Sequence, residues 1–181
     1  MLVPVQNGII TSEFYDPRPI SNPGAHIHGA IDITYEDTKM VYSPVKGIAT
    51  MFMVHRPKDW VWPKFEKEEI TEIPIHDYWY DVYGGVVAIE EPNGRYHILT
   101  HFYGKTLFEK YGIDKYIESI EISRWCGIIL QSKSFRVSRG DELVKMGNAG
   151  FSSGLHVHWE IHPTNKLVTY SKRINPHEYL A

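Results

Sequence analysis

The chain has 181 residues, enough for one domain with its own hydrophobic core but short for two ordinary domains. Hydrophobic residues make up 43% and charged residues 23%, which are globular proportions that exclude a fibrous repeat or wholesale disorder. Lys and Arg total 19 against 22 Asp and Glu, so there is no basic excess for binding nucleic acid or an anionic membrane. We therefore predict a single domain over residues 1–181, with no nucleic-acid partner and no membrane insertion.

The remaining composition directs attention to histidine. The single cysteine, Cys126, excludes an intramolecular disulfide and a cysteine-based zinc cluster. No segment approaches the roughly 18 apolar residues of a membrane span, and residues 1–10 show no signal-peptide pattern. Ten histidines, by contrast, are unusual, and most of them gather at positions 26/28, 97/101 and 156/158/162. We expect the functional site to lie among these clusters.

Short segments rich in Val, Ile, Tyr and Thr, separated by Gly, Pro and Asn, predict strands joined by turns. The predicted strands span residues 31–35, 47–54, 85–90, 96–102, 127–130, 142–146 and 155–161. Pro92-Asn93-Gly94 lies between two of them and predicts a hairpin, because Asn and Gly tolerate the positive φ of tight turns. The chain is therefore predicted to be mainly β.

Two segments interrupt the strand pattern, and we interpret both as insertions on the β scaffold. Residues 55–81 are rich in Trp, Pro and charge, whereas residues 105–123 place apolar residues at the spacing of a short helix. The aromatic residues of the first insertion either line a binding cleft or simply pack the insertion onto the scaffold. They are Trp60, Trp62, Tyr78, Trp79 and Tyr80.

Polar and apolar residues alternate around His156 and His158, which predicts a strand with both imidazoles on one face. Glu160 would share that face, where it is either a partner of the His158 ring or a solvated glutamate. The opposite, apolar face would carry Val157, Trp159 and Ile161. Taken alone, the histidine pair also fits an ordinary solvated strand face.

Two further positions offer the same chemistry. His28 and Asp32 are four residues apart, an even spacing that turns both side chains the same way in an extended chain. Imidazole nitrogen and carboxylate oxygen are ligands that suit zinc. His101 closes the predicted strand 96–102. Each of these features, taken singly, also fits a turn residue, a cap or a half-buried structural histidine.

Together, these motifs and the glycines beside them follow one order along residues 24–163. The order is His28-Gly-Ala-Ile-Asp32, Tyr42-Ser-Pro-Val-Lys-Gly47, Tyr83-Gly-Gly-Val-Val, His101, Gly147-Asn-Ala-Gly150 and Ser153-Gly-Leu-His156-Val-His158-Trp-Glu160. In this order the sequence resembles the lysostaphin/LytM-type zinc metallopeptidases, which cut peptide cross-links in bacterial peptidoglycan. The resemblance implies a single-domain antiparallel β-sandwich or β-groove of the LytM (duplicated hybrid motif) type, with loop and short helical insertions.

The resemblance also assigns roles to individual residues. It implies that His28, Asp32 and His158 bind Zn2+, while His101 and His156 form a second, catalytic pair. Zinc with an open position lowers the pKa of a bound water from 15.7 to about 7, which would supply the nucleophile. His101 and His156 would handle the proton and the developing oxyanion, in an order that the sequence leaves open. His26 lacks the four-residue spacing to Asp32 and is interpreted as a nearby polar residue.

The implied function is a zinc-dependent endopeptidase that hydrolyses peptide bonds in peptidoglycan cross-links or stem peptides. Two alternatives remain: a catalytically silent LytM-like binding or activator domain, and a structural phage tail component that binds zinc without turnover. No signal peptide or wall-binding module is visible in the sequence. This predicts a phage endolysin or virion-associated lysin that acts on the cell wall, released at lysis or carried on the virion.

Overall fold

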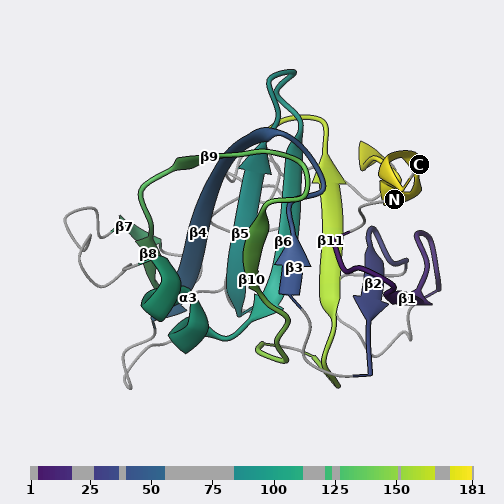
Figure 1. Ribbon diagram of the computed structural model, residues 1–181, viewed down its shortest axis with the longest axis horizontal. Helices are drawn as coiled ribbons and strands as arrows, with labels where there is room; N and C mark the ends of the chain where they lie inside the picture. The colour runs from purple at the N-terminus through teal and green to yellow at the C-terminus, as the bar shows by residue number, and fades with distance from the viewer. Residues whose placement is uncertain are drawn as a thin grey trace, which may run out of the picture.

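The computed structural model describes residues 4–17, 27–36, 40–55, 84–111, 121–123, 127–150, 152–165 and 172–180. Within them a large antiparallel sheet runs in the order β1-β2-β11-β6-β5-β4-β8-β7, and β9 also pairs with β4 (Figure 1). Its strands are β1 (Ile9–Ser12), β2 (Ile31–Thr34), β4 (Gly47–His55), β5 (Gly85–Glu90), β6 (Tyr96–Phe102), β7 (Glu121–Ser123), β8 (Gly127–Gln131), β9 (Phe135–Val137) and β11 (Val157–His162).

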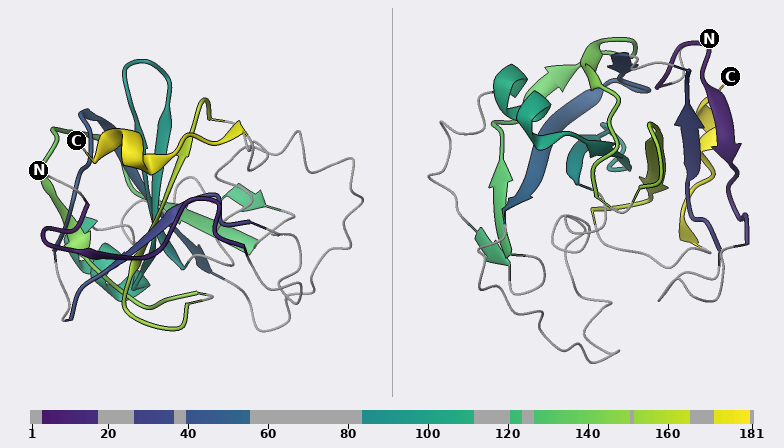
Figure 2. Two further views of the ribbon diagram at one scale, coloured as in Figure 1. Left: turned by 90° about the vertical axis from the view of Figure 1, so that its right-hand side faces the viewer. Right: turned by 90° about the horizontal axis from the view of Figure 1, so that it is seen from below.

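A second, two-stranded sheet lies in front of the large one in Figure 1. It pairs β3 (Met40–Tyr42) with β10 (Glu142–Lys145). Two helical elements complete the described structure: α3 (Gly104–Tyr111) and a short 3-10 helix, η4 (Pro176–Tyr179). Figure 2 shows η4 on the same side of the molecule as β1, beside the edge of the large sheet that carries β2 and β11.

The mainly β prediction is confirmed, and each of the seven predicted strands has a counterpart in the structure. The hairpin at residues 92–94 is also confirmed, because β5 and β6 pair on either side of it and Gly94 has a φ of 84°. Strands β1, β3, β7 and β9 were not predicted. Each has only three or four residues, too few for an alternating pattern to be recognised.

The helical insertion predicted over residues 105–123 is confirmed for residues 105–111 and wrong for residues 121–123, and residues 112–120 lie outside the described residues. Helix α3 ends at Tyr111, and Glu121–Ser123 form strand β7, which pairs with β8 at the edge of the sheet. The spacing of apolar residues within residues 105–123 could not reveal this pairing, because it carries no information about the partner strand β8. Residues 56–81, with the aromatic residues of the first insertion, lie outside the described residues, and the single-domain organisation stays a prediction.

The hydrophobic core lies between the large sheet and the small one. Trp159 of β11 and its cross-strand partner Leu99 of β6 are fully buried there, together with Met51 of β4. From the small sheet, Val41 and Val144 join the same cluster. This apolar face of β11 was predicted from its alternation, and it forces the intervening residues of the strand onto the opposite face.

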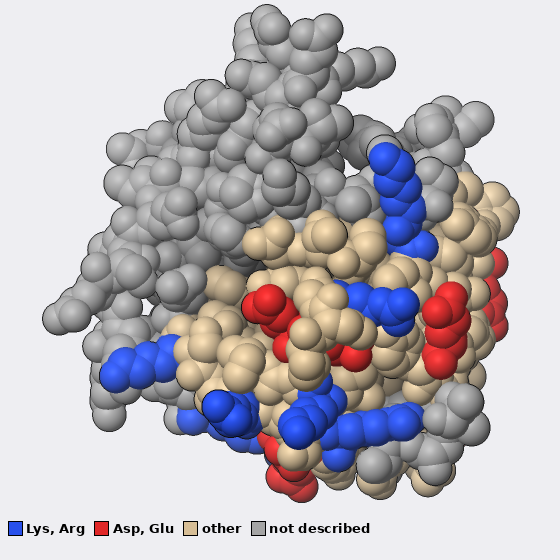
Figure 3. All heavy atoms as spheres, turned by 90° about the horizontal axis from the view of Figure 1, so that it is seen from above, with Lys and Arg blue, Asp and Glu red and all other residues tan. Residues whose placement is uncertain are grey.

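One face of the described part is mixed in charge. On the face seen from above, Lys and Arg side chains lie among Asp and Glu side chains, with no broad area of one sign (Figure 3). Among the described residues, no helix has both the length and the apolar character needed to cross a membrane.

Candidate metal centre

Three polar side chains meet on the face of the large sheet that is opposite the core. Asp32 of β2 lies directly across from His158 of β11 in the antiparallel register. Cross-strand partners project their side chains to the same face, so this register alone brings the carboxylate to the imidazole. His28 precedes β2 and reaches the same point, with its Nε2 3.2 Å from Asp32 Oδ1.

The turn at residues 13–16, which follows β1, fixes the orientation of the His28 ring. The backbone of His28 pairs with this turn, through its N–H to Asp16 O at 2.8 Å and its carbonyl to the N–H of Tyr15 at 2.7 Å. Nδ1 of His28 lies 3.1 Å from Glu13 O and 3.0 Å from Ser12 Oγ. Because a carbonyl only accepts, Nδ1 donates to Glu13 O, and Nε2 is the ring nitrogen that faces Asp32 and His158.

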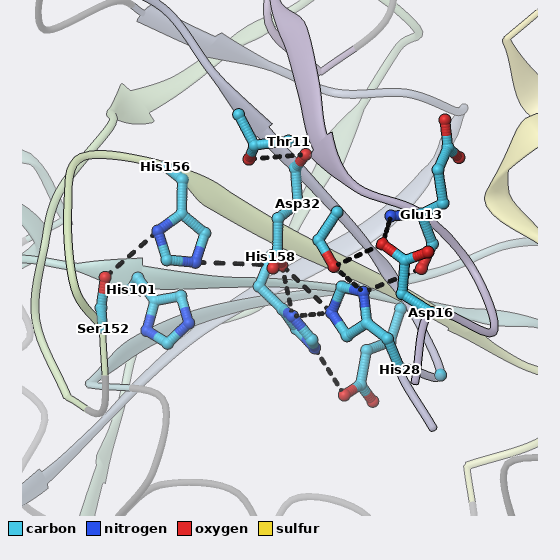
Figure 4. A network of polar contacts seen from close by, with 12 residues as sticks. Thr11, Glu13, Asp16, His28, Asp32, His101, Ser152, His156 and His158 are labelled. Carbon is cyan, nitrogen blue, oxygen red and sulfur yellow. Dashed lines mark hydrogen bonds and ion pairs between the residues drawn. The ribbon is translucent and has the colours of Figure 1, made fainter. Parts of the chain in front are cut away.

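The three inward-facing atoms have the chemistry and spacing of a metal site (Figure 4). His158 Nδ1 lies 2.7 Å from Asp32 Oδ1 and 3.1 Å from His28 Nε2. Around a tetrahedral zinc ion with bonds of about 2.0–2.1 Å, ligand atoms are separated by about 3.3 Å. Two imidazole nitrogens and one carboxylate oxygen at these distances fit Zn2+, which such residues also hold in catalytic sites that keep a fourth position open.

The Asp32 carboxylate and the His158 ring stabilise each other's charged forms. Burial opposes ionisation of Asp32, yet hydrogen bonds with His158 and His28 keep the pKa of that carboxyl well below its usual range. Burial alone would lower the pKa of His158, but the hydrogen bonds that it makes to Asp32 and Glu160 raise this pKa to about 9. The two groups therefore form a buried ion pair when no metal is bound, and a cation can take the place of the proton.

Glu160 lies behind the His158 ring, on the side away from Asp32. Its Oε1 is 2.8 Å from His158 Nε2, and the residue has no exposed surface. Of the two interpretations that the sequence left open, the structure selects the partner of His158 and excludes a solvated glutamate. A carboxylate that accepts from the outer nitrogen fixes the tautomer of a metal-ligating histidine and raises its basicity.

His101 reaches the site through an irregularity in β6. The register between β5 and β6 shifts between Gly85 and Val87, and His101 has a φ of 72°, which is uncommon for a residue with a side chain. A bulge of this kind redirects the side chain of the extra residue. The ring then lies 4.5 Å from that of His156 and 5.9 Å from that of His158, measured between centroids.

Residues of the loop before β11 hold His101 in this strained conformation. Nδ1 of His101 donates to Ala149 O at 2.8 Å, and the Ala149 N–H donates to His101 O at 3.1 Å. Gly147 allows the approach, because a Cβ atom there would meet His101 O at 2.5 Å. Burial, together with the neighbouring His158 and His156 rings, lowers the pKa of His101 to about 3, so the ring is neutral.

His156 completes the group from the same loop. Its Nδ1 lies 2.9 Å from Gly154 O and 3.1 Å from Ser152 Oγ, while its Nε2 lies 3.8 Å from Asp32 Oδ1 (Figure 4). The carbonyl of Gly154 only accepts, so Nδ1 again donates and Nε2 is the nitrogen that faces Asp32 and the candidate metal position. His101 and His156 thus present the same nitrogen, each oriented by a backbone carbonyl.

The sequence prediction needs one correction here. His156 does not lie within the strand, because β11 begins at Val157 and His156 makes only an isolated bridge with Gly147. Its side chain still reaches the side predicted for it. The structure brings together all five predicted site residues, namely His28, Asp32, His101, His156 and His158, whereas His26 lies outside the described residues.

Several contributors to the site were not predicted. The turn at residues 13–16, the carbonyls of Ala149 and Gly154, and the side chain of Arg173 carry no sequence signal. They act through backbone atoms or through contacts distant in the chain. Only the glycines of residues 147–150 hinted at a close backbone approach.

No protein-family model and no curated protein sequence matches this chain. Solved structures do match. The catalytic domain of the antimicrobial peptidase lysostaphin from Staphylococcus simulans aligns with a TM-score of 0.54 and 15% identity, over 99% of this chain and 98% of that chain. A chain of the SpoIIIAH–SpoIIQ complex aligns with a TM-score of 0.53 and 16% identity, over 98% of this chain and 97% of that chain.

A longer structure of lysostaphin from the same organism gives a TM-score of 0.52 and 16% identity, covering 96% of this chain and 49% of that chain. At such low identity these alignments describe the fold and leave the activity to the site itself. They agree with the antiparallel, mainly β architecture and with the order of motifs in the sequence. The chain therefore has the fold of the lysostaphin/LytM-type peptidase domains.

Proposed function

We propose that this chain is a zinc-dependent endopeptidase that hydrolyses peptide bonds in bacterial peptidoglycan. The observation that carries the proposal is the convergence of the His28–Asp32–His158 cluster with two further histidines whose Nε2 atoms face it. The peptidase fold of lysostaphin supports the same reaction class. A phage endolysin released at lysis, or a lysin carried on the virion, stays our proposal for its setting.

His28, Asp32 and His158 would hold the metal ion, since their three inward atoms already lie within 4.8 Å of one another. When bound, zinc supplies Lewis acidity for polarising the scissile carbonyl and for activating water. Asp32 and the His156 ring retain 13% and 15% side-chain exposure, so substrate and water reach the cluster from this side.

His101 and His156 would carry the proton transfers. Each ring donates from Nδ1 to a backbone carbonyl, so Nε2 is the nitrogen that would take up and return a proton. One ring accepts the proton of the attacking water and, as an imidazolium, returns it to the leaving amine. The other ring would stabilise the developing negative charge on the carbonyl oxygen.

A binding or activator domain is the second candidate function, favoured by one observation. The fold also occurs in a chain solved within the SpoIIIAH–SpoIIQ complex, so the architecture serves protein association as well as hydrolysis. A structural phage tail component with the same cluster is the third. Both alternatives leave peptide bonds intact.

The deciding experiment is mass spectrometry of fragments released from purified peptidoglycans of several cross-bridge types. We expect new peptide termini with the zinc-loaded protein, none after chelation, and at least about 10²-fold slower release with the His156→Ala variant. Intact peptidoglycan of every type, with folded and metal-loaded protein, would replace the peptidase by a binding or structural role.

A further inference from the structure

A buried charge network extends from the candidate metal centre into the C-terminal segment. Glu160 accepts from His158 Nε2 at 2.8 Å through Oε1 and from His162 Nε2 at 2.9 Å through Oε2. Arg173 supplies the formal positive charge, with Nη1 2.8 Å from Glu160 Oε1 and a side chain only 4% exposed. Such a buried carboxylate needs a permanent cation and several donors beside it.

Arg173 also touches the other half of the site. The same Nη1 lies 3.4 Å from the carbonyl oxygen of Gly29, the residue that follows His28. One guanidinium group therefore contacts both the acceptor behind the His158 ring and the backbone adjoining His28. His28 and His158, the two candidate ligands beside these contacts, are 130 residues apart in the chain.

The backbone around Arg173 is fastened independently of this contact. Ile174, the next residue, donates its N–H to Ile161 O at 3.0 Å, which ties the segment to β11. Beyond it, η4 is held by Tyr179, whose hydroxyl donates to Glu91 Oε1 at 2.8 Å and accepts from Arg95 Nη1 at 2.7 Å. The backbone that carries Arg173 is thus held in place by contacts outside the metal centre, and its guanidinium can in turn hold residues of that centre in place.

We propose that Arg173 is a positioning residue of the metal centre, bridging Glu160 and the Gly29 carbonyl so that His158 and His28 keep the spacing that a metal ion requires. Fixing the outer partner of a ligating histidine is worth roughly 10–100-fold in metal affinity. The inference rests on the proposed function, because both use the same metal cluster. It makes the C-terminal segment that carries Arg173 part of the site.

The test measures the zinc Kd of the full chain by competition with a chromophoric chelator. We expect Arg173→Met to weaken zinc binding by about 10–100-fold. Arg136→Met, on the exposed surface of β9, is the matched control and should bind zinc as the wild type does. Arg173→Lys should recover part of the affinity, because an ammonium supplies the charge but not the planar fork that reaches two acceptors.

A double variant separates positioning from simple charge balance. Glu160→Gln combined with Arg173→Met removes the buried carboxylate and its cation together, while the amide oxygen still accepts from His158. We expect the unfolding free energy of the metal-free protein to recover toward wild type while the zinc Kd stays weak. The visible absorption of the cobalt(II)-loaded Arg173→Met protein should also differ from that of the wild type.

Two results would overturn the inference: equal zinc affinity in Arg173→Met and Arg136→Met, or full recovery of affinity in the double variant. The second would reduce Arg173 to a structural counter-ion. If the wild type binds zinc but hydrolyses no peptidoglycan, the proposed function is refuted. The zinc Kd values of the variants then still decide whether Arg173 positions the metal centre. A wild type that binds no zinc would refute both.

Discussion

The five histidine and aspartate side chains of the site fall into two groups with opposite surroundings. His158 lies between two carboxylates, Asp32 and Glu160, and its pKa is raised to about 9. His101 faces a backbone carbonyl and other imidazoles, and its pKa is lowered to about 3. Both rings are buried, so burial alone does not decide the protonation of a histidine here.

The difference shows how one residue type can take two roles within a single site. Carboxylate partners concentrate negative charge around His158, which favours a cation at its inner nitrogen. Carbonyl partners orient the rings of His101 and His156 through Nδ1, so that Nε2 is the nitrogen that would act on a substrate. We expect the first group to determine metal binding and the second to determine turnover.

The largest expected effect is loss of the metal when a member of the first group is removed. His28→Ala deletes one of three ligand atoms, and we expect zinc affinity to fall by more than the roughly 100-fold that outer partners contribute. Metal content after dialysis and the zinc Kd measure it. Ser12→Ala is the matched control: Ser12 Oγ lies 3.0 Å from His28 Nδ1, but Glu13 O remains as acceptor. Stoichiometric zinc in His28→Ala would break the assignment.

The second effect concerns turnover without metal loss. His156→Ala removes an inward-facing Nε2 but none of the three clustered atoms, so zinc should stay bound while peptide hydrolysis falls by about 10²–10⁴-fold. Paired measurements of the zinc Kd and of the rate of fragment release test this separation. Ser152→Ala should fall much less, because the Gly154 carbonyl still orients the ring. Near wild-type hydrolysis by His156→Ala would contradict the assignment of turnover to the second group.

The smallest effect probes the backbone that orients the second group. A Cβ atom at Gly147 would meet His101 O at 2.5 Å and Tyr103 N at 2.9 Å, so Gly147→Ala must displace the bulge. We expect a loss of about 1–3 kcal/mol in unfolding free energy by urea titration, with reduced hydrolysis and retained zinc. At Gly154 a Cβ atom meets nothing within 4 Å, which makes Gly154→Ala the control. Equal stability of the two variants would count against this role for Gly147.

The core and the ligand-bearing face of β11 were both predictable from sequence, because alternation in a strand directly assigns side chains to faces. Trp159 is buried and His158 projects to the opposite face of the strand, as the alternation indicated, whereas the meeting of His158 with Asp32 was implied only by the family resemblance. The helix predicted to extend through residue 123 failed at its end, because periodicity cannot report a strand partner.

What the sequence by itself determined is therefore the strand pattern, the ligand types and the order of the motifs, all of which are local in the chain. Only the tertiary structure decided that Glu160 is a buried partner rather than a solvated residue, that a bulge turns His101 inward, and that Arg173 closes the network. The physical reason is that protonation and orientation depend on what surrounds a ring, and those neighbours come from distant segments and from backbone carbonyls that every residue shares.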